Sequence, residues 1–154
     1  MNNKEAGPVL IANRGEIAIR IARAARELGI FTIGIYAEDD DRSLHRFKVD
    51  KAIPLKGKGV SAYLDQEQIL QIAKKNQCRF LHPGYGFLSE NPGFALRCRE
   101  ENMLFIGPEP SVLQVFGNKA TARQLAEQHQ IPIIPGTVKA TSLKEVKAFF
   151  KTLE

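Results

Sequence analysis

Short apolar runs alternate along the chain with segments in which apolar residues recur every three or four positions. Runs typical of buried strands cover residues 8–12, 31–36, 51–55, 78–81 and 103–106. The helical pattern covers residues 16–28, 66–75, 94–101, 110–116, 117–129 and 143–153. Strands that alternate with helices predict an α/β fold, doubly wound around a mostly parallel sheet. The best candidate for a domain boundary in this pattern is residues 107–116.

The first helical segment, residues 16–28, separates apolar from charged side chains. Its apolar residues form one helical face and are Ile17, Ile21, Ala24, Ala25 and Leu28. The charged residues on its other faces are Arg20, Arg23, Arg26 and Glu27. Gly29 follows where a left-handed helix cap is expected. The segment therefore predicts an amphipathic helix between the first two strands.

Residues 82–92 form the most unusual stretch, with the sequence His-Pro-Gly-Tyr-Gly-Phe-Leu-Ser-Glu-Asn-Pro. The stretch joins a predicted strand to a predicted helix, which places it at the carboxyl edge of a parallel sheet, where such sheets bind ligands. Glycines on both sides of Tyr85 let the backbone turn sharply or let a ligand approach closely. An alternative is a tight turn with a capped helix, in which Ser89 is the N-cap and Pro92 lies in the first turn. The two interpretations are compatible.

Three other loops carry charge but no complete ligand motif. Asn13-Arg14-Gly15 follows the first strand where the dinucleotide fingerprint would place Gly-x-Gly-x-x-Gly, so a bound NAD is disfavoured. The acidic residues 38–41 are interpreted as a solvated loop. Residues 56–59, Lys-Gly-Lys-Gly, lack the spacing of a phosphate-binding loop and are interpreted as a mobile surface loop.

A third candidate for chemistry is Gly117-Asn118-Lys119, at the start of a predicted helix. A lysine in the first turn of a helix opposes the helix dipole. A phosphate shared by Lys119 and the helix terminus would compensate for this. The alternative is an exposed, solvated lysine.

Composition narrows the class of protein. The 154 residues are 44% hydrophobic and 25% charged, with a net charge of +5, which is ordinary for a globular protein. No apolar run approaches the length of a membrane span, and basic residues do not interleave with aromatic ones as on a nucleic-acid surface. The polar N-terminus lacks a signal-peptide core, and two cysteines form no disulfide framework. We therefore expect a cytoplasmic protein that binds neither nucleic acid nor membrane.

Four blocks together give a specific resemblance to a known family. They are residues 10–20, Leu-Ile-Ala-Asn-Arg-Gly-Glu-Ile-Ala-Ile-Arg; the loop 82–91; residues 105–108, Phe-Ile-Gly-Pro; and residues 117–119 with 132–137. In order and spacing these blocks resemble the N-terminal part of biotin carboxylase. The resemblance covers essentially the whole chain. It implies a Rossmann-like domain at residues 1–115 and the truncated start of an ATP-grasp domain at residues 116–154.

The resemblance implies ATP-dependent carboxylation of biotin within a pyruvate or acyl-CoA carboxylase. By that resemblance Lys119 contacts ATP, whereas Tyr85 and Gly86 lie beside the biotin ring. Arg23 and Glu27 match positions at the dimer interface of the family. The family usually has aspartate where this chain has Asn118, which removes a carboxylate beside the lysine.

The resemblance supplies no catalytic and no metal-binding residue within these 154 residues. The glycine-rich lid over ATP, the magnesium carboxylates and the bicarbonate site of the family lie beyond the position that matches Glu154. The chain alone is therefore expected to be inactive and to need the ATP-grasp, biotin carrier and carboxyltransferase domains as partners. Two alternatives remain at this point: a non-catalytic assembly or dimerisation module, and a fragment of a carbamoyl-phosphate synthase-like ATP-grasp enzyme.

Overall fold

The computed structural model describes residues 7–134 and 142–151. The chain divides into two compact units, the first ending at Pro110 and the second beginning at Ser111. The first unit contains the sheet, whereas the described residues of the second unit form helices and their connections.

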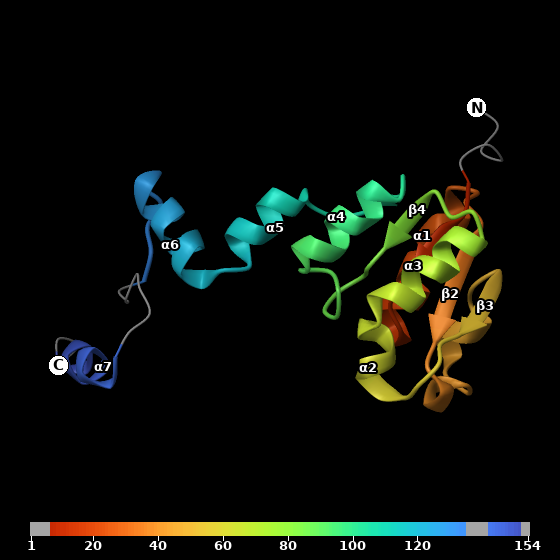
Figure 1. Ribbon diagram of the computed structural model, residues 1–154, viewed down its shortest axis with the longest axis horizontal. Helices are drawn as coiled ribbons and strands as arrows, with labels where there is room; N and C mark the ends of the chain where they lie inside the picture. The colour runs from red at the N-terminus through yellow and green to blue at the C-terminus, as the bar shows by residue number, and fades with distance from the viewer. Residues whose placement is uncertain (1–6, 135–141, 152–154) are drawn as a thin grey trace. The chain divides into compact units, whose positions relative to one another are not determined.

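The first unit is built on a five-stranded sheet in which every paired strand is parallel (Figure 1). In chain order the strands are β1 (Val9–Ile11), β2 (Thr32–Tyr36), β3 (Lys51–Pro54), β4 (Phe80–His82) and β5 (Leu104–Phe105). Their order in the sheet is β3-β2-β1-β4-β5. The predicted α/β class and parallel sheet are thereby confirmed, with β1 at the centre.

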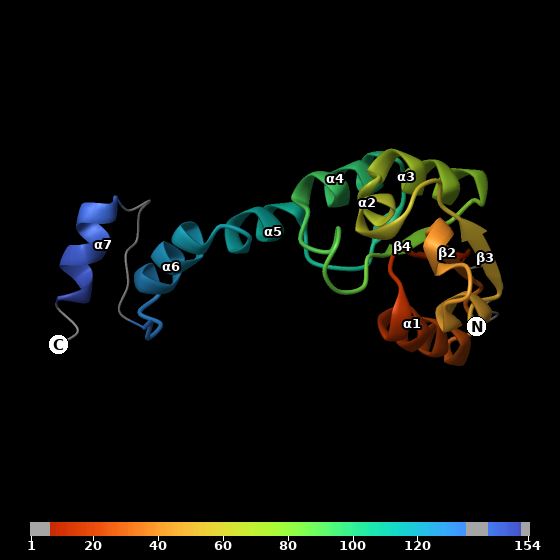
Figure 2. The same cartoon turned by 90° about the horizontal axis from the view of Figure 1, so that it is seen from below.

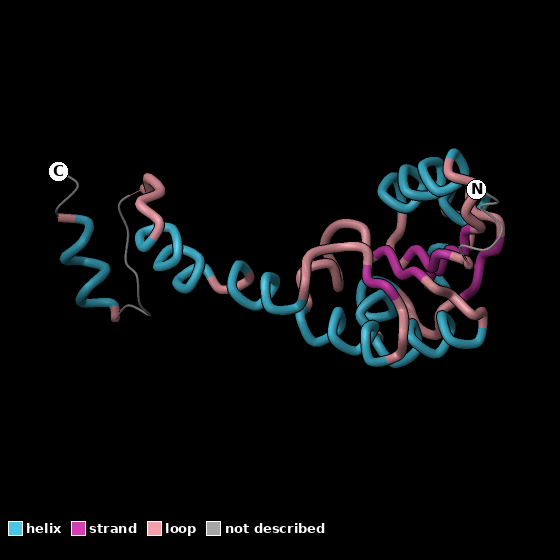
Figure 3. Tube along the Cα trace, turned by 90° about the horizontal axis from the view of Figure 1, so that it is seen from above, coloured by secondary structure: helices cyan, strands magenta, loops and turns pink. Residues whose placement is uncertain are grey.

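Helices cover the two faces of the sheet unequally. Helix α1 (Gly15–Glu27) lies on one face, while α2 (Gly59–Leu64), α3 (Gln66–Lys75) and α4 (Pro92–Glu100) lie on the other (Figure 2). The tube in Figure 3 shows the strands between these two groups of helices. The strand order explains the division, since the chain winds outward from β1 first through β2 and β3 and then through β4 and β5.

The core has a thick layer and a thin layer, separated by the sheet. Because side chains alternate across a strand, Leu10 joins the large cluster under α3 and α4, whereas Ile11 joins the small cluster under α1. The large cluster also contains Tyr63 and Phe94, both completely buried. The α1 side offers far less buried apolar surface, which leaves part of that face open.

The packing of α1 differs from its sequence pattern. The residues buried against the sheet are the alanines Ala18, Ala22 and Ala25, while Leu28 is 59% exposed. Small side chains let the helix axis approach the strands closely, so the bulkier predicted residues are displaced to the flank of the helix. The amphipathic helix was correctly predicted. The face that packs on the sheet, however, is formed by Ala18, Ala22 and Ala25 and is not centred on the predicted apolar face.

The helix caps follow local hydrogen bonding. Asp65 caps α3, because its carboxylate accepts a hydrogen bond from the Gln68 amide. The N-cap of α4 is Asn91, whose side chain accepts a 2.8 Å hydrogen bond from the Phe94 amide. The predicted cap at Ser89 is wrong, because the Ser89 amide donates to the Gly86 carbonyl and so belongs to the preceding turn. Pro92 occupies the first turn as expected.

The second unit begins within α5 (Pro110–Phe116) and continues through α6 (Lys119–Gln128) and α7 (Leu143–Phe150). Ser142 and Glu145 form a capping box: the Ser142 amide donates to the Glu145 carboxylate, and the Glu145 amide donates to the Ser142 hydroxyl. The sequence Thr141-Ser142 before residue 143 predicts a helix cap shared by both residues, but Thr141 lies outside the described residues. The type of all three helices agrees with the sequence patterns, but α6 begins at Lys119 rather than at residue 117, because Asn118 is its N-cap.

Histidine 45 makes the stability of the first unit depend on pH. Its ring is buried in a short 3₁₀ helix, Leu44–Phe47, where Nε2 lies 3.2 Å from the Ile35 carbonyl and Nδ1 has no hydrogen-bond partner among the described residues. Burial lowers the pKa of His45 below its ordinary value of 6.5, and burial also lowers that of His82. The unfolded chain therefore binds protons more readily, so stability is full above about pH 6.5 and falls as the pH drops below it.

We expect the free energy of unfolding, measured by urea titration, to decrease between about pH 7.5 and 5.5. Replacing His45 with glutamine should flatten this dependence, because an amide can still donate to the Ile35 carbonyl and does not titrate. His129→Gln is the control, since His129 is exposed. An H45Q variant with the full pH dependence of the unaltered chain would contradict the assignment.

Candidate site at the carboxyl edge of the sheet

The central loop, residues 82–91, lies where the winding of the sheet reverses direction. It follows β4, and β4 pairs directly with β1, from which the chain also leaves toward β2. In open α/β sheets this position is the usual ligand site. The loop after β1, Asn13 to Gly15, therefore lies beside the central loop.

Asn13 binds the two loops together. Its side-chain amide donates to the Pro83 carbonyl at 2.7 Å and to the Tyr85 carbonyl at 2.9 Å. Its side-chain oxygen accepts a hydrogen bond from the Arg14 amide at 3.0 Å. Asn13 is only 3% exposed, so these bonds form away from water, where an unpaired polar group is costly. A buried side chain from one loop thus fixes the backbone of the other.

His82 holds the turn from the strand side. The Gly84 amide donates to Nδ1 of His82 at 3.0 Å, which leaves the ring proton on Nε2. Burial lowers the pKa of His82, so the neutral ring that accepts this bond is the stable form. His82 therefore orients the turn by accepting a hydrogen bond.

Above these contacts, Tyr85 and Gly86 face solvent. Tyr85 is 76% exposed, and a Cβ atom added at Gly86 would meet nothing within 4 Å. Beneath them Leu88 is buried, and Phe87 stacks on Tyr63 with ring centroids 5.2 Å apart. The loop is therefore a stiff platform with an open outer surface.

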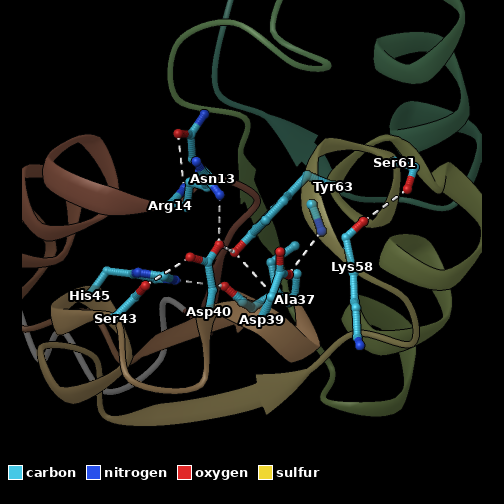
Figure 4. A network of polar contacts seen from close by, with 12 residues as sticks. Asn13, Arg14, Ala37, Asp39, Asp40, Ser43, His45, Lys58, Ser61 and Tyr63 are labelled. Atoms are coloured by element: carbon cyan, nitrogen blue, oxygen red, sulfur yellow. Dashed lines mark hydrogen bonds and ion pairs between the residues drawn. The ribbon is translucent and has the colours of Figure 1, made fainter.

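A second polar network joins the loop after β1 to the loop after β2 (Figure 4). The Asp40 carboxylate accepts hydrogen bonds from Arg14 at 2.9 Å, from the Tyr63 hydroxyl at 2.8 Å and from the Ser43 hydroxyl at 2.8 Å. Tyr63 in turn accepts a hydrogen bond from the Ala37 amide. Although burial opposes the change, these donors hold the pKa of Asp40 below its ordinary value. Arg14 is thereby fixed beside Asn13.

The acidic run and the Lys-Gly loop bind each other, which corrects both sequence interpretations. The Gly57 amide donates to Glu38, and the Gly59 amide donates to Asp39. The loop also joins β3 to α2, a strand-to-helix context that the sequence pattern did not reveal. Because the carboxylates of Glu38 and Asp39 accept hydrogen bonds from these amides, the Lys-Gly loop is held in place. The acidic residues therefore have a structural role beyond being solvated.

Lys119 is the first residue of α6 in the second unit, and its side chain is exposed. The side chain of Asn118 caps the helix by accepting hydrogen bonds from the Ala120 and Thr121 amides at 3.0 and 3.2 Å. Asparagine therefore makes this turn without a carboxylate. Since the cap already occupies two helix amides, a phosphate here would contact Lys119 rather than those two donors.

Arg23 and Glu27, the predicted dimer residues, are exposed on α1. Both line a surface depression of about 640 Å³ on the outer side of the helix.

Several residues of the candidate site were not recognised from the sequence pattern. Asn13, Asp40 and Tyr63 were not predicted to contact the loops, although the position of Asn13 directly after a buried strand was a usable signal.

Within residues 7–134 and 142–151, no cluster of three or more His, Cys, Asp and Glu side chains is placed to hold a metal ion. In the same part of the chain, no helix has the length and apolar character needed to cross a bilayer.

Comparison with known proteins identifies the domain. The family model described as biotin carboxylase, N-terminal domain, matches residues 5–113. The chain belongs to this family. The match decides between the biotin carboxylase interpretation and the carbamoyl-phosphate synthase alternative, and it covers the Asn13 loop and the central loop together.

Pyruvate carboxylases are among its relatives. The Bacillus subtilis enzyme is 50% identical over 153 residues, covering 97% of this chain and 13% of the relative. The human mitochondrial enzyme is 47% identical, with 94% and 12% covered. The solved biotin carboxylase domain of a single-chain bacterial carboxylase matches with a TM-score of 0.91 and 47% identity, covering 96% of this chain and 34% of that one. The chain thus spans about an eighth of the curated relatives.

Proposed function

We propose that this chain is the N-terminal part of a biotin carboxylase within a pyruvate or acyl-CoA carboxylase. In that reaction ATP phosphorylates bicarbonate to carboxyphosphate, which yields phosphate and carbon dioxide, and a biotin ureido nitrogen captures the carbon dioxide. The observation that carries the proposal is the central loop, held by the buried Asn13 side chain and by the half-buried His82 ring so that Tyr85 and Gly86 stay exposed. The family match supports the same reaction.

The platform at Tyr85 and Gly86 fits a flat, neutral ring such as that of biotin. The outer side of Gly86 is open to close approach, and Tyr85 offers an exposed aromatic ring with a polar end. These two residues would orient the ring of a biotin that is carried on a partner domain. Within this chain we assign no catalytic residue.

Lys119 would contribute a cation to ATP. An exposed lysine at the start of a ten-residue helix lies where negative charge is favoured. With Asn118 capping the helix, the contact is made by the lysine side chain. Magnesium, which neutralises phosphate charge when bound, would be held by segments that follow in the family.

The remaining domains of a carboxylase are the proposed partners, and α1 with Arg23 and Glu27 is the proposed dimer face. Exposure of both side chains beside one depression supports that role. We place the Rossmann-like domain at residues 1–115 and the start of the ATP-grasp domain at 116–154. Buried free thiols at Cys78 and Cys98 support the proposed cytoplasmic location.

The proposal is tested by joining this chain to the rest of the biotin carboxylase domain of the Bacillus subtilis pyruvate carboxylase. Bicarbonate-dependent ATP cleavage, with and without free biotin, is measured on this hybrid and on the chain alone. We expect activity in the hybrid only. A correctly folded hybrid without activity would leave a non-catalytic assembly module as the better interpretation.

In that hybrid, Tyr85→Ala is expected to raise the KM for biotin about tenfold while the fold is kept, since loss of one ring contact costs about 1.4 kcal/mol. The side chain is mostly exposed, so its removal leaves the core intact. Steady-state kinetics with varied biotin provide the measurement, and the KM for ATP is the internal control. An unchanged KM for biotin would remove Tyr85 from the site.

Lys119→Gln is expected to raise the KM for ATP by about tenfold, because a charged contact to phosphate is worth on the order of 1.5 kcal/mol. Lys144→Gln is a matched control, since Lys144 is also exposed near the start of a helix. Equal effects of the two substitutions would contradict a specific role for Lys119.

A further inference from the structure

One half of the sheet face that carries α1 is open. Side chains alternate along β5, so Phe105 packs against the main core while Leu104, on the other face, is 60% exposed. Ile106, just beyond the strand, is 39% exposed. Within residues 7–110 the helix on this side, α1, packs against β1 and β2, in the other half of the sheet. Parallel sheets are normally covered on both faces, so this exposure needs an explanation.

The open half forms a groove of about 550 Å³. Its floor includes Phe80 and Leu104 from β4 and β5, and its wall is the flank of α1 with Ile17 and Ile21. Among the residues that line it, all within the described part of the chain, Arg20 alone carries a formal charge. The displaced apolar stripe of α1 therefore has a function in this arrangement: it forms one side of an apolar groove.

We propose that this groove is the docking site for an amphipathic helix from the polypeptide that completes the biotin carboxylase domain. The inference rests on the proposed function, because the occupant belongs to the same domain. In the matched single-chain bacterial carboxylase, this chain covers 34% of the biotin carboxylase domain, so about two thirds of that domain is further polypeptide. A helix with an apolar stripe would complete the missing layer of the sheet.

The lining of the groove specifies the chemistry of the occupant. The apolar floor and wall require Leu-, Ile- or Phe-like side chains, while Arg20 at the rim favours a carboxylate on the occupant. A second copy of the same unit is a poorer occupant, because a symmetric dimer would place the groove against itself and two concave surfaces do not fill each other.

Docking here would also support the central loop from behind. His82, Gly84 and Tyr85 line the same groove, at the end where it meets the carboxyl edge. An occupant would exclude water from the neutral His82 ring, which accepts the Gly84 amide. The groove therefore couples assembly of the whole domain to the stiffness of the proposed biotin platform.

The test is co-expression of this chain with the part of the Bacillus subtilis biotin carboxylase domain that follows the matched 153 residues. Co-purification and the dissociation constant of the complex report docking, and bicarbonate-dependent ATP cleavage reports the proposed function separately. The groove variants are Leu104→Lys and Ile106→Lys, both at exposed positions that line the groove and not the depression beside Arg23 and Glu27. The matched control is Leu96→Lys, which is 46% exposed on α4 across the sheet.

We expect a one-to-one complex whose affinity falls at least about tenfold in each groove variant, because a charge is forced into an apolar contact. The control should bind like the unaltered chain, and circular dichroism should show the same fold in all variants. Equal binding by groove and control variants would overturn the docking site, even if the complex cleaves ATP.

Failure of the unaltered chain to bind, or self-association abolished by the groove substitutions, would overturn the proposal as well. In the second case a further copy of the chain is the occupant. Groove-dependent binding without ATP cleavage would uphold the docking site and contradict the proposed function, so the two failures are distinguishable.

Discussion

Replacing Gly84 with alanine is expected to lower the free energy of unfolding by about 2–4 kcal/mol, from backbone strain and overpacking together. The backbone of Gly84 has a φ of +71°, and a Cβ atom there would lie 2.5 to 2.8 Å from three atoms of the Asn13 side chain. Asn13 cannot move away without giving up its bonds to Pro83 and Tyr85. Urea unfolding of the chain measures the change.

Gly86→Ala is the matched control for this substitution. Gly86 has nearly the same backbone conformation, with a φ of +68°, but a Cβ atom there meets nothing within 4 Å. Gly86→Ala should therefore lower the free energy of unfolding only by the cost of backbone strain, about 1–2 kcal/mol. Equal destabilisation by the two substitutions would show that contact with Asn13 contributes nothing.

Asn13→Asp is expected to destabilise the chain by about 3 kcal/mol or more, although the side chain hardly changes in size. The substitution replaces a group that donates two hydrogen bonds with a carboxylate oxygen directed at two carbonyl oxygens, those of Pro83 and Tyr85. The site is buried, so water cannot screen the repulsion. In the hybrid enzyme the same variant should also raise the KM for biotin.

The control is Asn91→Asp, which makes the same chemical change at a position where the side chain only accepts. Asn91 caps α4 by accepting from the Phe94 amide, and a carboxylate at a helix N-terminus is equally suitable. Its free energy of unfolding should stay within about 0.5 kcal/mol of that of the unaltered chain. Similar losses at both positions would mean that the loop does not depend on donation by Asn13.

Much of the fold could be predicted because its information is local. The five apolar runs and the helical periodicity each lie within a short stretch, and the caps at Asp65 and Asn118 lie next to the helices that they start. The packing stripe of α1 could not be read in the same way. Hydrophobicity favours Ile17 and Ile21, whereas close approach to the sheet selects Ala18 and Ala22, and that choice depends on the strands beneath.

The site was predictable in its position and not in its connections. A strand followed by Gly-Tyr-Gly indicates a turn at the carboxyl edge of the sheet, where the structure places it, while the roles of Tyr85 and Gly86 at this turn stay a prediction from the family resemblance. The residues that fix the loop lie far away in sequence, and their partners are backbone carbonyls that carry no sequence signal. Likewise, Asp40 was indistinguishable from its acidic neighbours until the fold placed it against Arg14 and Tyr63.

The bond between Asn13 and Pro83 joins residues 70 positions apart, which has a consequence for the order of folding. Closing so long a loop is entropically costly, and β4 reaches β1 only after a crossover from β3 at the far edge of the sheet. The platform at Tyr85 therefore takes its final shape late, once the central pair of strands has formed. In a nascent chain, the final shape of this loop would thus report that β1 and β4 have paired.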